Sequence, residues 1–146
     1  MLSGKDRIRK TLLCEATDRP PWVPYVGCHG GYLIGKGSAE YLRSTDLIVQ
    51  GVSRAIELYK PDGVPVTFDL QIEAEVLGCD LVWADQNPPS VSSHPAAGGF
   101  NPDAFRIPGP DEGRIKVVLD AARQLAGAFP DIALYGLPTG PFTLAL

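Results

Sequence analysis

A single carboxylate, Asp69, stands where an apolar run ends and a helical pattern begins. The stretch GVPVTFDLQIEAEVLGCD, residues 63–80, has the pattern of a buried strand up to Phe68 and helical spacing after Asp69. A carboxylate at this position can accept the amides of the first helical turn, which contributes about 1 kcal/mol. Because a carboxylate only accepts hydrogen bonds, it can also take several N–H donors of a ligand and oppose a positive charge. Helix cap and ligand-binding residue are therefore both open interpretations of Asp69.

A thiol and an imidazole lie next to each other in the glycine-rich stretch GCHGGYL, residues 27–33. Adjacent residues such as Cys28 and His29 rarely bind one ion together, and no third ligand is near in sequence, so we expect no metal site here. A polar contact with a ligand and a plain structural role both stay open. The other cysteines, Cys14 and Cys79, are distant and form no CxxC pattern, which argues against a disulfide framework or a structural zinc site.

Length and composition indicate one globular domain. The chain has 146 residues, of which 45% are apolar and 21% charged, and its formal net charge is -4. Since lysine and arginine form no basic face, we expect no nucleic-acid binding. The first residues, MLSGKDRIRKTLL, contain no apolar signal segment, and no run approaches the length of a membrane span. We therefore expect no membrane association and a cytoplasmic location.

Apolar periodicity predicts helices that alternate with strands. The predicted helices cover residues 5–15, 45–59, 70–77 and 114–129, with another beginning at Pro141, and the predicted strands cover 22–26, 62–68 and 132–140. Residues 29–38 have the composition of a loop. Residues 81–113 contain six prolines, which predicts a long irregular excursion with one hairpin. The alternation implies an α/β fold with parallel strands and crossover helices.

Four segments resemble the uroporphyrinogen decarboxylase superfamily in their order and separation. They are RIRKTLLCEATDRPPW, ELYKPDGVPVTFD, FDLQIEAEVLG and GLPTGPFTLA. The superfamily also contains zinc-dependent methyltransferases that work with corrinoid proteins. The resemblance runs through nearly all 146 residues and is weakest between residues 81 and 113.

The resemblance implies a (β/α)₈ TIM barrel, for which about 250 residues are typical. Residues 1–146 would then be the N-terminal portion of one such barrel domain, incomplete in this chain. The chain would be a truncated piece or the product of a split or shortened gene. Because an incomplete barrel leaves open strand edges, we expect self-association.

The resemblance also implies roles for individual residues. Asp69 would be the catalytic carboxylate, pointing into the cleft and accepting the pyrrole N–H groups of a tetrapyrrole or corrinoid-type ligand. The expected substrate-binding residues come from the glycine-rich stretch and from the end of the strand: Cys28, His29, Gly30, Gly31, Tyr32 and Phe68.

The glycine-rich stretch separates the two branches of the superfamily. Decarboxylases that resemble this chain carry two arginines, four residues apart, which bind the carboxylates of the porphyrinogen. The matching positions here are Gly27 and Gly31, and no arginine lies between Arg19 and Arg43. We therefore expect an enzyme of the corrinoid-dependent methyltransferase or an uncharacterised branch. The alternatives are a uroporphyrinogen decarboxylase, a lyase of porphyrin biosynthesis, and a non-catalytic binding or assembly fragment.

The expected cofactor differs between these branches. A decarboxylase needs none, whereas a methyltransferase would use zinc held by a His-x-Cys pair and a later cysteine. Those ligands would lie beyond Leu146, so we expect no cofactor within this chain and zinc in the full-length protein. A corrinoid protein would then be a partner.

Overall fold

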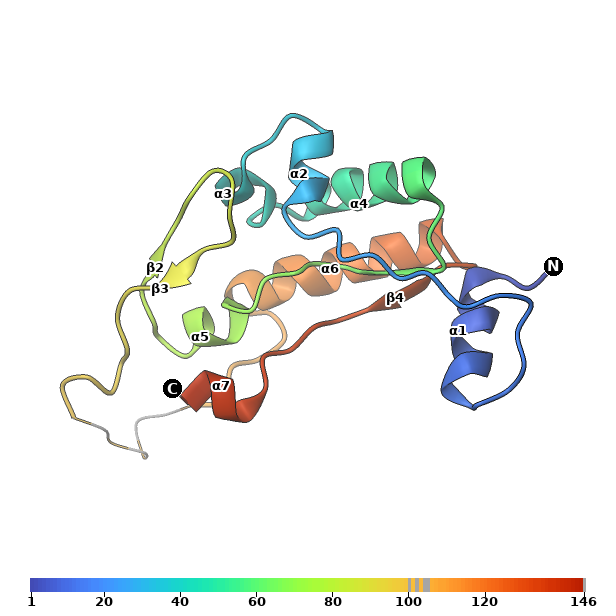
Figure 1. Ribbon diagram of the computed structural model, residues 1–146. Coiled ribbons are helices and arrows are strands. Elements are labelled where there is room, and N and C mark those ends of the chain that lie inside the picture. The colour runs from blue at the N-terminus through green and yellow to red at the C-terminus, as the bar shows by residue number, and fades with distance from the viewer. Residues whose placement is uncertain (100, 102, 104–105, 146) are drawn as a thin grey trace.

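The computed structural model describes every residue except 100, 102, 104–105 and 146. The described residues form seven helices and four strands, shown in Figure 1. The helices are α1 (Gly4–Leu12), α2 (His29–Leu33), α3 (Ser38–Tyr41), α4 (Thr45–Tyr59), α5 (Ile72–Val76), α6 (Gly113–Ala128) and α7 (Pro141–Ala145). The strands are β1 (Gly63–Pro65), β2 (Leu81–Val82), β3 (Ser90–Val91) and β4 (Ala133–Tyr135).

Strands β1 and β4 pair in parallel, from Gly63 opposite Ala133 to Pro65 opposite Tyr135. Helix α6 provides the chain that leads into β4, and it packs against α4 (Figure 1). The core between these elements comes from α4, β1 and α6, with side chains that are nearly inaccessible to solvent: Ile48, Val52, Ala55, Val64, Ala121 and Leu125. The predicted parallel arrangement with helical crossovers is therefore confirmed.

Helix α4 occupies residues 45–59, as its periodicity predicts. The residue that caps it is Ser44, whose Oγ accepts from the amide of Leu47 at 3.3 Å. The neighbouring Thr45, which has a side chain of the capping type, instead donates its Oγ–H to the carbonyl of Val117 in α6 at 3.1 Å. Within the described residues, no helix has both the length and the apolar character that crossing a membrane requires.

The predicted strand at residues 22–26 is wrong. This segment has no strand assignment, and its Trp22 carbonyl accepts from the amide of Asp62, the residue just before β1, at 2.9 Å. Pro24 lies in the middle of the segment and has no N–H to donate, which explains why the pairing does not continue.

The predicted loop at residues 29–38 is also wrong, because this stretch contains α2 and begins α3. Glycines allow these helices to pack closely on α4. A Cβ on Gly30 would lie 2.3 Å from the hydroxyl of Tyr41, and one on Gly51 of α4 would lie 2.5 Å from the carbonyl oxygen of Gly30. The absence of side chains at Gly30 and Gly51 therefore sets the distance between α2 and α4.

The excursion at residues 81–113 contains the predicted hairpin. Strands β2 and β3 pair antiparallel, with Leu81 opposite Val91 and Val82 opposite Ser90. Asp80 closes the base of the hairpin, because its carbonyl accepts from the Ser92 amide at 2.9 Å and its carboxylate from the Ser93 hydroxyl at 2.6 Å. Residues 81–91 are called the excursion hairpin below.

Candidate functional site

Asp69 lies in a buried ion pair. It lies four residues after the end of β1, in a segment without regular secondary structure, and its side chain is inaccessible to solvent. One carboxylate oxygen accepts from the Gln71 amide at 2.9 Å, which caps the turn before α5. The other accepts from Nη1 of Arg114, the second residue of α6. Asp69 therefore faces neither bulk water nor an open cavity in this conformation.

Arg114 is a site residue that sequence reasoning missed. It is 5% exposed, and its Nε donates to Glu75 of α5 at 2.5 Å. Its Nη2 is buried and has no acceptor among the residues that the structure describes. A signal exists in the sequence, because Arg114 shares a helical face with the buried residues Ala121 and Leu125, and a buried guanidinium requires a carboxylate partner.

A polar cavity near Asp69 lies between α2, α3 and the excursion hairpin. It has a volume of about 590 Å³ and is called the α2–α3 cleft below. Its lining comprises Cys28, His29, Tyr32, Lys36, Gly37, Ser38, Asp85 and Gln86. The structure thus gathers Cys28, His29 and Tyr32, three of the residues expected to bind substrate.

Cys28 lines this cleft, and the charge of Asp69 acts on its thiol. Burial raises the pKa of its thiol above the ordinary value, and the negative charge of Asp69 raises it further. A hydrogen bond with Ser38 opposes this shift without cancelling it. The thiol is therefore protonated at neutral pH and is a weak nucleophile in this state.

His29 sits between two tyrosines. Its ring centre is 5.8 Å from those of Tyr32 and Tyr59, and its Nε2 is 2.7 Å from the Tyr59 hydroxyl. Tyr32 is 77% exposed, so it offers a free aromatic face beside the cleft. One imidazole nitrogen is therefore engaged with α4, and the exposed aromatic surface is available for contact with a ligand.

The remaining expected site residues lie elsewhere. Gly30 and Gly31 are buried against Tyr41 and do not line the cleft. Phe68 is half-buried, and its ring centre is 5.1 Å from that of the exposed Tyr25. Phe68 therefore does not line the cleft, although it packs next to Cys28, since a Cβ on Gly27 would lie 3.3 Å from the Phe68 Cβ.

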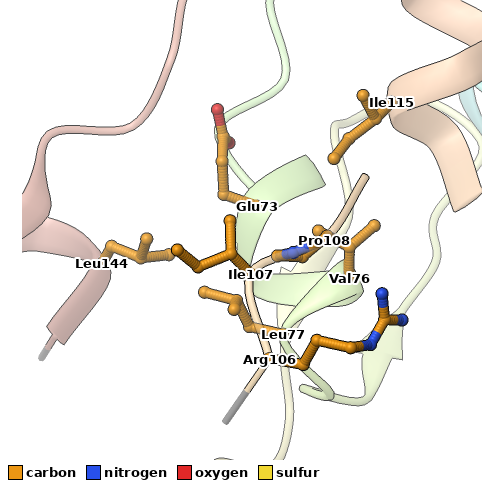
Figure 2. Close-up of a pocket in the computed structure, with 8 residues that line it drawn as sticks. All are labelled: Glu73, Val76, Leu77, Arg106, Ile107, Pro108, Ile115 and Leu144. Carbon is orange, nitrogen blue, oxygen red and sulfur yellow. The ribbon is translucent and has the colours of Figure 1, made fainter. Parts of the chain in front are cut away.

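A second cavity, of about 310 Å³, is almost entirely apolar (Figure 2). Its lining comes from α5, the segment before α6, the first turn of α6, and α7: Glu73, Val76, Leu77, Arg106, Ile107, Pro108, Ile115 and Leu144. Figure 2 shows Ile107 at the centre of these side chains, with the guanidinium of Arg106 directed away from it. This cavity contains none of the residues predicted from the sequence.

The described residues contain no group of three or more histidine, cysteine, aspartate or glutamate side chains that could hold a metal ion. The three cysteines are all free. Cys28 and His29 line the α2–α3 cleft, and they do not form part of a complete zinc site within the described chain.

The sequence and the structure both resemble known proteins. The sequence profile of the family "Uroporphyrinogen decarboxylase (URO-D)" matches residues 3–146. A methylated-thiol–coenzyme M methyltransferase of Methanosarcina mazei is 41% identical over 81 residues, which cover 53% of this chain and 21% of that protein. The methylcobamide:CoM methyltransferase MtbA of Methanosarcina acetivorans is 30% identical over 86 residues, 58% of this chain and 25% of that protein.

The solved structure of a methyltransferase from Methanosarcina mazei superimposes with a TM-score of 0.84 at 24% identity. The match covers 99% of this chain and 44% of that chain, and it establishes a shared fold. The chain thus spans about a fifth to a quarter of the length of these curated relatives and less than half of the solved structure.

Proposed function

Because the chain belongs to the uroporphyrinogen decarboxylase family, we propose that it forms the N-terminal part of a (β/α)₈ barrel enzyme that transfers a methyl group from a corrinoid to a thiol. The parallel pairing of β1 with β4 across the crossover helix α6 supports the barrel. The names of two curated relatives, which are methyltransferases of methylcobamide or methylated thiols, support the choice of branch.

The observation that carries this proposal is that positions 27 and 31 hold glycines and leave no space for a long side chain. These glycines stand where the resembling decarboxylases have arginines. Gly27 has a φ of +48°, which favours glycine, and a Cβ on Gly31 would lie 2.9 Å from the Tyr41 ring. Neither position can therefore carry a long cationic side chain without local rearrangement. A polycarboxylate porphyrinogen would find no guanidinium at either position, which disfavours decarboxylation of such a substrate.

We assign the ligand-binding side chains of this part to two neighbouring places. Cys28, His29 and Tyr32 would contact the ligand in the α2–α3 cleft, and Asp69 would act as an acceptor for N–H donors of the ligand. Asp69 uses one lone pair for Gln71 and one for Arg114, so acceptor capacity remains on both oxygens. Because Asp69 is buried, a ligand can reach its carboxylate only if some of the residues that now cover it move aside.

The described residues contain no set of side chains that fits zinc. Zinc in the full-length protein remains part of the proposal, with ligands outside the described residues. A corrinoid protein is the proposed partner, and the cytoplasm is the proposed location, which three free cysteines support. Self-association through the edges of the β1–β4 sheet is also proposed.

The test uses the full-length protein that contains this chain. Purified protein is incubated with methylcobalamin and 2-mercaptoethanesulfonate, and the methylated thiol is measured by mass spectrometry beside a zinc determination. A parallel assay offers uroporphyrinogen. Methyl transfer to the thiol with no decarboxylation supports the proposal, whereas a metal-free protein that decarboxylates uroporphyrinogen would overturn it.

A further inference from the structure

The tip of the excursion hairpin forms one wall of the α2–α3 cleft. Asp85 and Gln86 line the cavity opposite Cys28, and the Asp85 carbonyl accepts from the Ser38 amide at 2.7 Å. A Cβ on Gly37 would lie 3.3 Å from a carboxylate oxygen of Asp85, so the hairpin fits closely against the turn before α3. The shape of the cleft therefore depends on how firmly this hairpin is docked.

Trp83 provides the anchor of the hairpin. Its ring lies 3.9 Å from the guanidinium carbon of Arg43 and 4.8 Å from that of Arg114, and it packs against the hydrophobic core. Guanidinium groups at these distances are attracted to the face of an indole, and Arg43 is the exposed member of the pair. Trp83 thus joins the hairpin to α6 and to the turn that follows α3.

Arg114, which contacts Trp83, also binds Asp69. Arg114 donates to Asp69 and Glu75, and its Nη2 has no acceptor among the described residues. Buried polar atoms of a purely structural arginine are normally all paired. The unpaired Nη2 belongs to the same guanidinium whose carbon lies 4.8 Å from the Trp83 ring, so the indole contributes to the surroundings of this group.

We propose that Trp83 is a positioning residue, which holds residues 83–86 as the wall of the α2–α3 cleft and orients Arg114 on Asp69. This inference rests on the proposed function, because it takes the cleft and Asp69 as parts of one ligand site. Opening of the hairpin would widen the cleft, admit water to Cys28 and free Arg114 to turn.

The reactivity of the Cys28 thiol measures whether the hairpin is docked against the cleft. This measurement does not require enzymatic turnover. In a chain with Cys14→Ser and Cys79→Ser, the rate of alkylation of Cys28 by iodoacetamide is measured from pH 6 to 10. The titratable groups near the thiol are Asp69, His29, Tyr41, Lys36 and Asp85. Burial is the largest cause of the raised pKa, so exposure to water moves the profile to lower pH.

We expect Trp83→Leu to raise the alkylation rate at pH 8 about fivefold, since ~1 kcal/mol corresponds to that factor at 1.4 kcal/mol per tenfold change. Trp83→Phe keeps an aromatic face and should restore most of the slow rate. An unchanged rate and pH profile in a folded Trp83→Leu variant would overturn the inference.

If Trp83→Leu fails to fold, Arg43→Gln provides the test and Arg54→Gln provides its control. Arg43→Gln removes the exposed cation on the indole and should accelerate alkylation in the same direction. Arg54→Gln is the matched control, because Arg54 is exposed on α4 and its ion pair is a 3.8 Å contact with Glu57. Equal rates for Arg43→Gln and the unsubstituted chain would count against the inference, while methyl-transfer assays decide the proposed function separately.

Discussion

Asp69 and Arg114 are 45 residues apart in the sequence and form a buried ion pair that joins the end of the β1 segment to the first turn of α6. Glu75 completes the arrangement from α5. The carboxylates approach the N-terminal end of α6, where the helix dipole favours negative charge. The pair therefore fixes three elements that surround the candidate site relative to one another.

We expect Arg114→Met to destabilise the chain by about 3–5 kcal/mol, because it leaves the carboxylate of Asp69 buried without a partner. Urea unfolding followed by circular dichroism measures the change. The double variant Asp69→Asn, Arg114→Met should recover part of the loss, since it removes the uncompensated charge.

Arg123→Met is the control on the same helix. Arg123 is 70% exposed and pairs with Asp120 at the surface, so its loss should cost less than about 1 kcal/mol. A similar loss of stability for Arg114→Met and Arg123→Met would show that the buried pair contributes no more than a surface pair.

Gly30→Ala should destabilise the packing of α2 on α4 by about 1–3 kcal/mol, the usual cost of adding a methyl group to a filled space. Its Cβ would meet the Tyr41 hydroxyl at 2.3 Å, and Tyr41 is 1% exposed. Gly127→Ala offers the opposite case, because open space surrounds that position in α6. It should stabilise by about 0.5–1 kcal/mol. Thermal unfolding of both variants tests the pair, and equal shifts would contradict the packing argument.

The parts of the fold that the sequence predicted are those with strong local patterns. Both ends of helix α4 are predicted to the residue, because its apolar stripe ends before Lys60 and Pro61. In the structure Lys60 has a left-handed backbone conformation that ends the helix. The strand expected at residues 22–26 was not found, since apolar content alone does not show that Pro24 blocks the ladder. The helix α2 was missed because two glycines indicate a loop locally, while their contacts with Tyr41 are decided by tertiary packing.

The candidate site could be predicted only where its residues stand in a strong local sequence pattern. The position of Asp69 after a strand is a local pattern, and Cys28 and His29 are conspicuous by type. The roles of Trp83 and Arg114 depend on contacts across 31 residues and more, which no periodicity reveals. The sequence thus predicts a hairpin within residues 81–113, but it does not predict that this hairpin forms a wall of the cleft.

Residues 1–146 alone should show no methyl transfer from methylcobalamin to a thiol and no decarboxylation of uroporphyrinogen. The reason is that the proposed barrel site needs residues beyond these, and the described residues contain no group of side chains that could hold a metal ion. The measurement is product formation by the purified 146-residue chain beside the full-length protein. Turnover by the short chain, at a rate comparable to that of the full-length protein, would contradict this expectation.

Acid should weaken the ion-pair cluster at the opposite end of β1. A hydrogen bond and charge attraction from Arg7 lower the pKa of Asp18 from its ordinary value of 3.8 to about 2. Burial would raise the pKa of Asp62, but bonds from Arg19 and from the Trp22 amide outweigh it and lower that pKa. Because the folded state holds these carboxyl groups at a depressed pKa, their stabilising contribution is complete above about pH 4 and decreases as the pH falls toward 2.

Asp18→Asn therefore should lower the thermal midpoint at pH 7, and the difference from the unsubstituted chain should shrink between pH 4 and pH 2. Circular dichroism melts at each pH measure this difference. Asp131→Asn is the control, since Asp131 is exposed and its side chain makes no ion pair with the described residues. A constant difference for Asp18→Asn across this range would mean that Asp18 gains nothing from Arg7 in the folded state.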